Sequence, residues 1–159
     1  MDVNEAREIA NAALAGLTAD VAEDLKLDDE GVCRLVFNDG GNIYVVLDAA
    51  SADLIVWSPA GIVAAEDGAA PLRTLLQANL FWGGTNGATL ALAPDGETVI
   101  LQRRVPLHGL QSEELSGAIE QTLQDATSFN QGLAHGAVLA EVETAEAAAA
   151  RPHHGAIRG

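Results

Sequence analysis

The 159-residue sequence has a single cysteine and lacks the long apolar run of a membrane protein. Its single cysteine, Cys33, cannot form an internal disulfide, which is consistent with a reducing compartment. No run of about 18 apolar residues occurs, so no transmembrane helix is expected. The first residues lack the basic and apolar stretches of a signal peptide, and we therefore expect a cytoplasmic protein.

Basic residues are also scarce, since 8 Lys and Arg stand against 23 Asp and Glu and give a formal net charge of -15. Phosphate binding requires clustered Lys and Arg, so nucleic acid and anionic membranes are unfavourable partners. The acidity favours basic or amphipathic protein partners, or it serves solubility alone. Apolar residues make up 48% of the chain, which is enough for the core of one domain.

No segment has the pattern of a catalytic, metal or cofactor site. The glycine-rich stretch 83–87 follows a predicted helix and precedes a strand, whereas a phosphate-binding loop would open a helix. His153 and His154 lack the further ligands that a metal site requires. Cys33 has no base nearby in sequence, and the adjacent acids at 28–30 do not face one pocket. We therefore expect no enzymatic activity, metal or cofactor.

Apolar residues recur at spacings of three and four in three segments, which predicts three helices. The first spans residues 3–17 and begins at an Asp2 cap. The second runs from Pro71 to Trp82 and ends at a glycine pair. The third begins near Ser112 and weakens toward the glycines that follow residue 131.

Period-two patterns predict five strands, at residues 32–38, 42–48, 53–58, 88–93 and 98–105. A turn at 38–41 joins the first two as a hairpin, and Pro59 and Gly61 end the third, with Ile62 and Val63 as a short continuation. The order α-β-β-β-α-β-β-α indicates an α+β domain with an antiparallel twisted sheet over residues 1–136. Residues 137–159 are expected to form a disordered tail or a frayed helix.

The strands at 42–48 and 53–58 are apolar on both faces. A sheet that packs helices on one face normally carries polar residues on the other, and three helices are too few to cover both. A second copy of the chain or a client polypeptide would cover the remaining surface. The alternative is that the helices and the tail cover the whole sheet.

Several segments together resemble a known family. They are Leu72–Phe81, Gly84–Leu92, Val99–Leu107 and Leu110–Leu115. This succession resembles the class I type III secretion chaperones, the Tir-chaperone (CesT-like) family. That family has a leucine-rich helix ending in Asn-Leu-Phe, a glycine-rich link, a strand of small residues and an Arg-x-Pro-Leu-like element before the last helix. The resemblance covers residues 3–134 in element order and is strongest at 72–107.

The resemblance implies a homodimer in the bacterial cytoplasm that binds the N-terminal region of a secreted effector in extended form. It implies strand addition at a sheet edge and no use of ATP. Dimer contacts are expected at Leu75, Leu76, Asn79, Leu80, Leu90 and Leu92. Effector contacts are expected at Val32, Arg34, Val36, Tyr44, Val46 and Trp57, although a one-residue shift would exchange the two faces.

Two other functions are compatible with the sequence. One is a non-catalytic, dimeric adaptor or scaffold domain that binds another protein. The other is a small enzyme or ligand-binding domain, which would require a deep pocket with converging polar groups. The sequence does not identify the effector or the role of residues 137–159.

Overall fold

The computed structural model describes residues 1–17, 25–38 and 40–135, so the tail predicted at 137–159 lies outside the described residues. The helices and strands are α1 (Val3–Ala15), β1 (Val32–Val36), β2 (Asn42–Asp48), β3 (Asp53–Ile62), α2 (Ala69–Ala78), β4 (Thr89–Leu92), β5 (Thr98–Pro106) and α3 (Ser112–His135). Two 3₁₀ turns, Ala65–Asp67 and Leu80–Trp82, flank α2. The predicted order α-β-β-β-α-β-β-α is confirmed.

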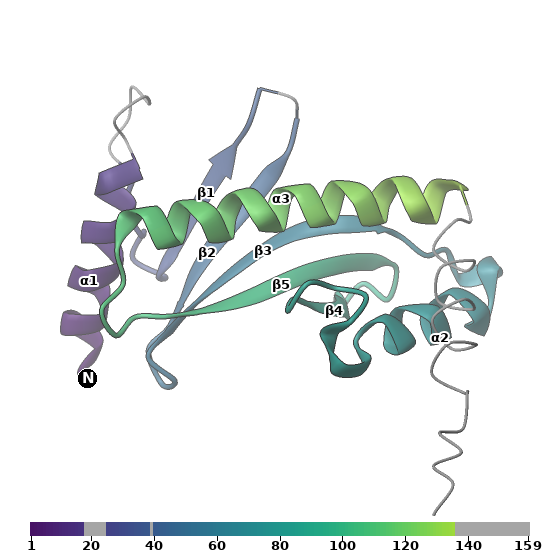
Figure 1. The fold of residues 1–159 in the computed structure, drawn as a ribbon, viewed down its shortest axis with the longest axis horizontal. Coiled ribbons are helices and arrows are strands. Elements are labelled where there is room, and N and C mark those ends of the chain that lie inside the picture. The colour runs from purple at the N-terminus through teal and green to yellow at the C-terminus, as the bar shows by residue number, and fades with distance from the viewer. Residues whose placement is uncertain (18–24, 39, 136–159) are drawn as a thin grey trace, which may run out of the picture.

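The five strands form one antiparallel sheet in the order β1-β2-β3-β5-β4 (Figure 1). The register places Arg34 opposite Tyr44, Tyr44 opposite Trp57, and Trp57 opposite Gln102. Since side chains opposite one another share a face, these residues form one row across four strands.

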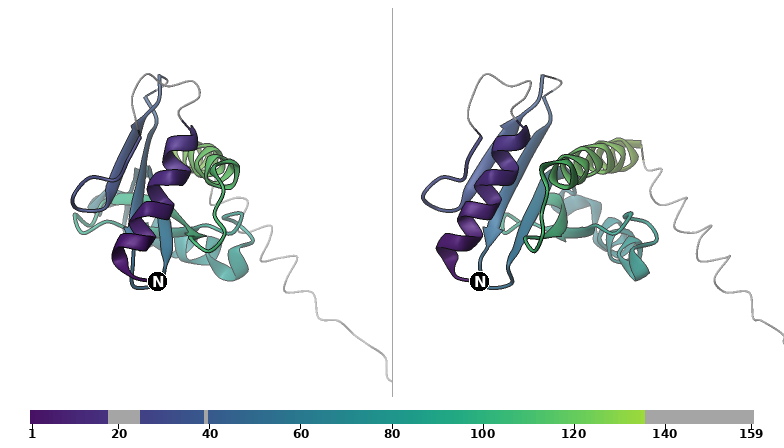
Figure 2. Two further views of the ribbon diagram at one scale, coloured as in Figure 1. Left: turned by 90° about the vertical axis from the view of Figure 1, so that its left-hand side faces the viewer. Right: turned by 60° about the vertical axis from the view of Figure 1, so that its left-hand side comes forward.

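All three helices pack on the same face of this sheet. The long helix α3 crosses β3 and β5, and α1 lies beside it over the β1–β2 end (Figure 2). One core cluster joins α1 and α3 to β1, β2, β3 and β5, and includes Leu14, Ile43, Leu54 and Leu115. A second cluster joins α2 and the far end of α3 to β4 and β5, and includes Leu75, Leu90 and Leu101. No described helix covers the opposite face of the sheet.

The predicted cap of α1 is confirmed, because the Asp2 carboxylate accepts hydrogen bonds from the backbone N–H groups of Asn4 and Glu5. Small residues then dominate the buried side of α1, which lets the helix approach the sheet and α3 closely. At its end, a Cβ on Gly16 would lie 1.9 Å from the Ser112 Oγ atom. The absence of a side chain at Gly16 therefore permits the contact between α1 and the start of α3.

Two predicted boundaries are wrong by four residues each. The third strand does not stop at residue 58 but runs to Ile62, through an irregularity between Pro59 and Gly61. The second helix ends at Ala78, four residues before the predicted end at Trp82. The chain then makes a 3₁₀ turn with left-handed backbone at Phe81 and Trp82, where φ is 54° and 55°.

A buried ionic network holds β5, α3 and the loop before β4 together. The Arg103 Nη2 atom lies 2.7 Å from the Asp125 Oδ2 atom, and the side chains are 15% and 8% exposed. Arg103 also donates to the Asn86 carbonyl at 2.6 Å, while Asn86 and Gln121 donate to the other Asp125 oxygen. Buried charges are tolerated when they are paired and hydrogen-bonded in this way.

Candidate functional site

The first apolar surface is the face of the sheet opposite the helices, which we call the open face. Its positions alternate along each strand with the buried core positions. Its apolar members are Val32, Val36, Tyr44, Val46, Ile55, Trp57, Ile62 and Ile100. All six residues predicted to bind an effector lie on this face, so the predicted alternation placed them together. Ile55, Ile62 and Ile100 belong to the same face and were missed, although the alternation around Trp57 indicates Ile55.

A row of stacked side chains occupies the centre of the open face. The Tyr44 and Trp57 rings stack with centroids 4.1 Å apart and an interplanar angle of 10°. The Arg34 guanidinium lies 5.7 Å from the centroid of the Tyr44 ring and donates to the Asn42 Oδ1 atom at 2.7 Å. Stacking between neighbouring strands favours a flat, preformed platform, because the side chains are already held in place.

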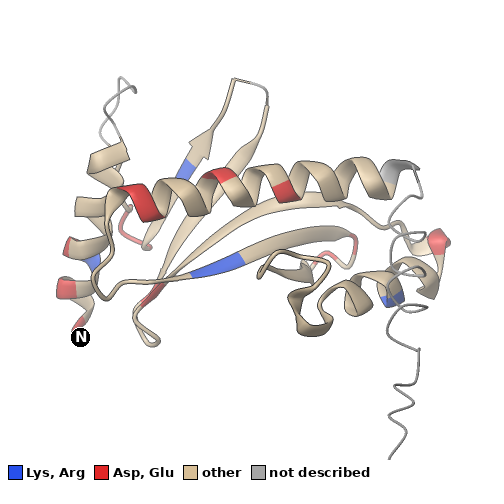
Figure 3. Cartoon of the chain, viewed as in Figure 1, with Lys and Arg blue, Asp and Glu red and all other residues tan. Residues whose placement is uncertain are grey.

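One margin of the open face is polar. The Arg104 guanidinium bridges Asp48 and Asp53, each at 3.2 Å. The Ser51 hydroxyl donates to Asp48 at 2.6 Å and lowers the pKa of that carboxyl, with a smaller contribution from Arg104. Figure 3 shows that acidic residues otherwise lie on helices and connections more than on strands. Apart from Arg34, the centre of the open face is therefore uncharged, although the chain as a whole is strongly acidic.

A second apolar surface surrounds the end of α2, and we call it the α2 patch. It consists of Leu76, Leu80, Phe81, Trp82 and Leu92, which are 70%, 64%, 85%, 58% and 40% exposed. Phe81 and Trp82 were missed as surface residues because their apolar character indicated a continuing helix. A bulky residue with left-handed backbone is strained, so this turn must be held by its surroundings.

The residues predicted at the dimer interface divide into two groups. Leu76, Leu80 and Leu92 lie on the α2 patch and are exposed. Leu75 and Leu90 are buried in the core of the single chain, 7% and 5% exposed. Their burial shows a packing role within one chain, and an interface role for the six residues stays a prediction.

Asn79, the sixth of these residues, binds the peptide groups of Leu90 at the free edge of β4. Its carboxamide donates to the Leu90 carbonyl at 2.9 Å and accepts from the Leu90 N–H at 2.8 Å. The Ala93 N–H bonds to Thr98 of β5, so in an antiparallel ladder the Leu90 peptide groups point away from β5. A strand that approached this edge would find both groups of Leu90 already occupied.

The opposite edge, at β1, is occupied at one end. Asp28 accepts from the Val32 N–H through its side chain and donates its own N–H to the Val32 carbonyl, at 2.9 and 2.8 Å. The same alternation directs the peptide groups of Arg34 and Val36 away from β2, toward this edge. No hydrogen bond from another described residue outside the sheet is recorded to these peptide groups.

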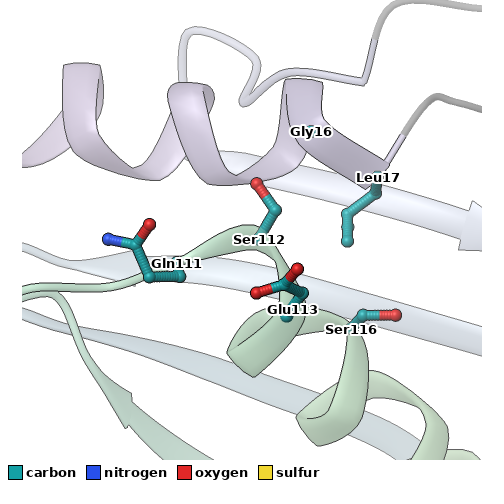
Figure 4. A pocket seen from close by; sticks show the side chains of 6 residues that line it. All are labelled: Gly16, Leu17, Gln111, Ser112, Glu113 and Ser116. Atoms are coloured by element: carbon teal, nitrogen blue, oxygen red, sulfur yellow. The ribbon is translucent and has the colours of Figure 1, made fainter.

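The described residues also form a hollow of 370 Å³ where the end of α1 meets the start of α3. It is lined by Gly16, Leu17, Gln111, Ser112, Glu113 and Ser116 (Figure 4). The lining offers hydroxyl groups and one carboxylate but no imidazole or thiol. Among residues 1–17, 25–38 and 40–135, no three His, Cys, Asp or Glu side chains gather as metal ligands would. No described helix is long and apolar enough to cross a membrane.

Comparison with known proteins decides the family. A family model, that of the Tir chaperone protein (CesT) family, matches residues 13–130. The chain belongs to the Tir chaperone (CesT) family. The predicted family is therefore confirmed, and the family is one of non-catalytic chaperones. A search of curated protein sequences gave no match.

Solved structures show the same fold at low sequence identity. A chain of the ExsC–ExsE complex superposes with a TM-score of 0.68 and 20% identity, over 82% of this chain and 96% of that one. A chain of the HopA1–SchA chaperone–effector complex gives 0.68 and 16%, over 81% and 98%. The Yersinia pestis type III secretion chaperone SycH, in complex with a YscM2 fragment, gives 0.59 and 14%, over 79% and 99%. The predicted α+β fold class is confirmed.

Proposed function

We propose that this chain is a type III secretion chaperone that binds the N-terminal region of a secreted effector on the open face. It keeps that region extended and soluble in the bacterial cytoplasm and acts without catalysis. The observation that carries this proposal is the apolar face of the sheet that no described helix covers, with the stacked Tyr44–Trp57 platform at its centre. Membership in the Tir chaperone family supports the same function.

Binding would gain free energy from covering apolar side chains of both molecules. Each Å² of apolar surface removed from water contributes about 25 cal/mol, and ordering an extended segment costs roughly 2–5 kcal/mol of that gain. The platform is already rigid, which reduces the ordering cost on the chaperone side. Strand addition fits the β1 edge better than the β4 edge, because the Asn79 side chain already bonds to the N–H and C=O groups of Leu90 on β4.

The chaperone would act as a homodimer through the α2 patch. The exposed leucines and aromatic residues of this patch favour self-association, and like net charges on two copies require an apolar interface. Leu80→Asp should give monomers in light scattering, because each interface would bury unpaired carboxylates. Ile62→Asp is the matched control, since Ile62 is 69% exposed on the open face. A Leu80→Asp variant that keeps the dimer mass would refute this interface.

Co-expression with the product of the adjacent gene tests the main proposal. A chaperone should co-purify with a large secreted protein and increase its soluble yield through that protein's first hundred or so residues. Deleting those residues should abolish co-purification. A non-catalytic adaptor or scaffold domain, the second candidate, would bind independently of that region.

Trp57→Glu tests the location of the binding site. The variant places a carboxylate at the centre of the platform and should reduce co-purification at least tenfold, while the dimer mass stays the same. Thr127→Glu on the exposed side of α3 is a matched control that adds the same charge away from the open face. Unchanged retention by Trp57→Glu would place the site elsewhere.

A further inference from the structure

Arg34 differs from the other charged residues of the open face because it binds no carboxylate of a described residue. The ion pairs among the described residues involve Arg103, which is buried, and Arg104, which neutralises Asp48 and Asp53. Arg34 is exposed, and its single recorded hydrogen bond goes to the neutral Asn42 amide. No other described residue accepts a hydrogen bond from its remaining N–H donors, out of the five that a guanidinium carries.

Two contacts orient the Arg34 guanidinium. It rests near the Tyr44 ring, which stacks on Trp57, and Asn42 holds one of its nitrogens. A guanidinium held in this way loses little conformational freedom when it binds a planar anion, and it presents two parallel donors to a carboxylate. The apolar side chains around it lower the competition from water once a bound segment covers them.

The local charge of the open face differs from that of the whole chain. The five strands contain two acidic residues, Asp48 and Asp53, and both are bonded to Arg104. Among the described residues, Arg34 is thus a positive charge without an acidic partner, on strands whose two carboxylates are both bonded to Arg104. The net charge of -15 would by itself indicate a basic partner, whereas the binding surface favours an acidic group at this position.

We infer that the segment bound on the open face carries an Asp or Glu that pairs with Arg34, beside an apolar residue that covers the Tyr44–Trp57 platform. This inference rests on the proposed function and specifies the chemistry of its partner. Arg34 is then a specificity-determining residue. It selects segments with a carboxylate next to an apolar anchor and disfavours segments with Lys or Arg at that position.

Phage display of random dodecapeptides tests the predicted preference for an acidic residue. The same library is selected in parallel on the full-length wild-type protein, on Arg34→Glu and on Arg73→Glu. Arg73 is exposed on α2, so its variant changes the net charge equally without altering the open face. The wild-type and Arg73→Glu pools should both be enriched in Asp or Glu near an aromatic or aliphatic residue. The Arg34→Glu pool should instead be enriched in Lys or Arg.

One selected peptide is then synthesised in two forms, one with its acidic residue and one with Lys at that position. Calorimetry gives the difference in affinity between the two peptides. Replacement by Lys should weaken binding to the wild type roughly tenfold, and Arg34→Glu should reverse the preference. An equal preference in the wild type and in Arg34→Glu, a basic wild-type pool, or no enrichment would overturn the inference.

Trp57→Glu separates the two proposals: if it binds the peptide and the effector region as tightly as the wild type, the proposed site itself fails. If it loses binding while Arg34→Glu keeps the wild-type preference, only the role of Arg34 fails.

Discussion

Arg103 and Arg104 are neighbours on β5, but their side chains lie on opposite faces of the sheet and should contribute very differently to stability. Arg103 is 15% exposed and ion-paired with Asp125, whereas Arg104 is 62% exposed. Arg103→Met leaves the Asp125 carboxylate buried without its cation, and breaking a buried pair in this way costs roughly 3 kcal/mol. Arg104→Gln breaks exposed pairs, which contribute little.

Urea unfolding followed by circular dichroism measures this difference. With a denaturant slope of about 2 kcal/mol/M, Arg103→Met should lower the midpoint by about 1.5 M, and Arg104→Gln should lower it by less than about 0.3 M. The double variant Arg103→Met/Asp125→Leu should recover most of the loss, because it removes both buried charges. Equal losses for the two single variants would refute the reasoning, as would a double variant that is less stable than Arg103→Met.

Three further predictions concern pH, the cysteine and the tail. Backbone N–H groups of Glu5 and Asn4 lower the pKa of Asp2, so the stabilising effect of the Asp2 cap falls progressively as the pH drops below the ordinary range for Asp. The N-terminal amides of α1 should then exchange faster, and the absence of such a change would count against the cap. Burial raises the pKa of the Cys33 thiol, so a disulfide reagent at pH 8 should react at least tenfold more slowly than in urea; equal rates would contradict its burial. A chain of residues 1–136 should keep the melting temperature and dimer mass of the full chain, and loss of either would assign the tail a structural role.

The sequence predicted the strands best where pairing is regular. Strand β2 was predicted with its observed bounds, because the turn at 38–41 directly precedes it and its apolar run ends at Leu47. Strand β3 was predicted too short, since Pro59 and Gly61 indicate an end when they are considered locally. In the sheet, the Pro59 nitrogen points toward the β2 side, beyond the last β2–β3 pair at Tyr44 and Trp57, so no partner on that side requires its N–H. Whether β3 can continue through a proline therefore depends on where its pairing with β2 stops, and the residues around Pro59 do not indicate this.

The end of α2 was mispredicted for a related reason. Apolar residues continue at helical spacing to Trp82, but Asn79 bonds to Leu90, eleven residues later, and the chain turns there. The same contact explains why the α2 patch was only partly predicted: the turn exposes Phe81 and Trp82, which a straight helix would have placed differently. On the open face, by contrast, the six predicted residues share one face because the alternation alone decides it.

The carboxamide of Asn79 has a consequence for the behaviour of the free protein at high concentration. Sheets that join edge to edge without limit need two available edges on each molecule, one to receive and one to offer. With Leu90 occupied, pairing between copies is less favourable at β4 than at the β1 edge, and pairing through β1 alone would end at a closed pair. We therefore expect Asn79 to oppose edge-to-edge aggregation of a molecule whose apolar sheet face no described helix covers.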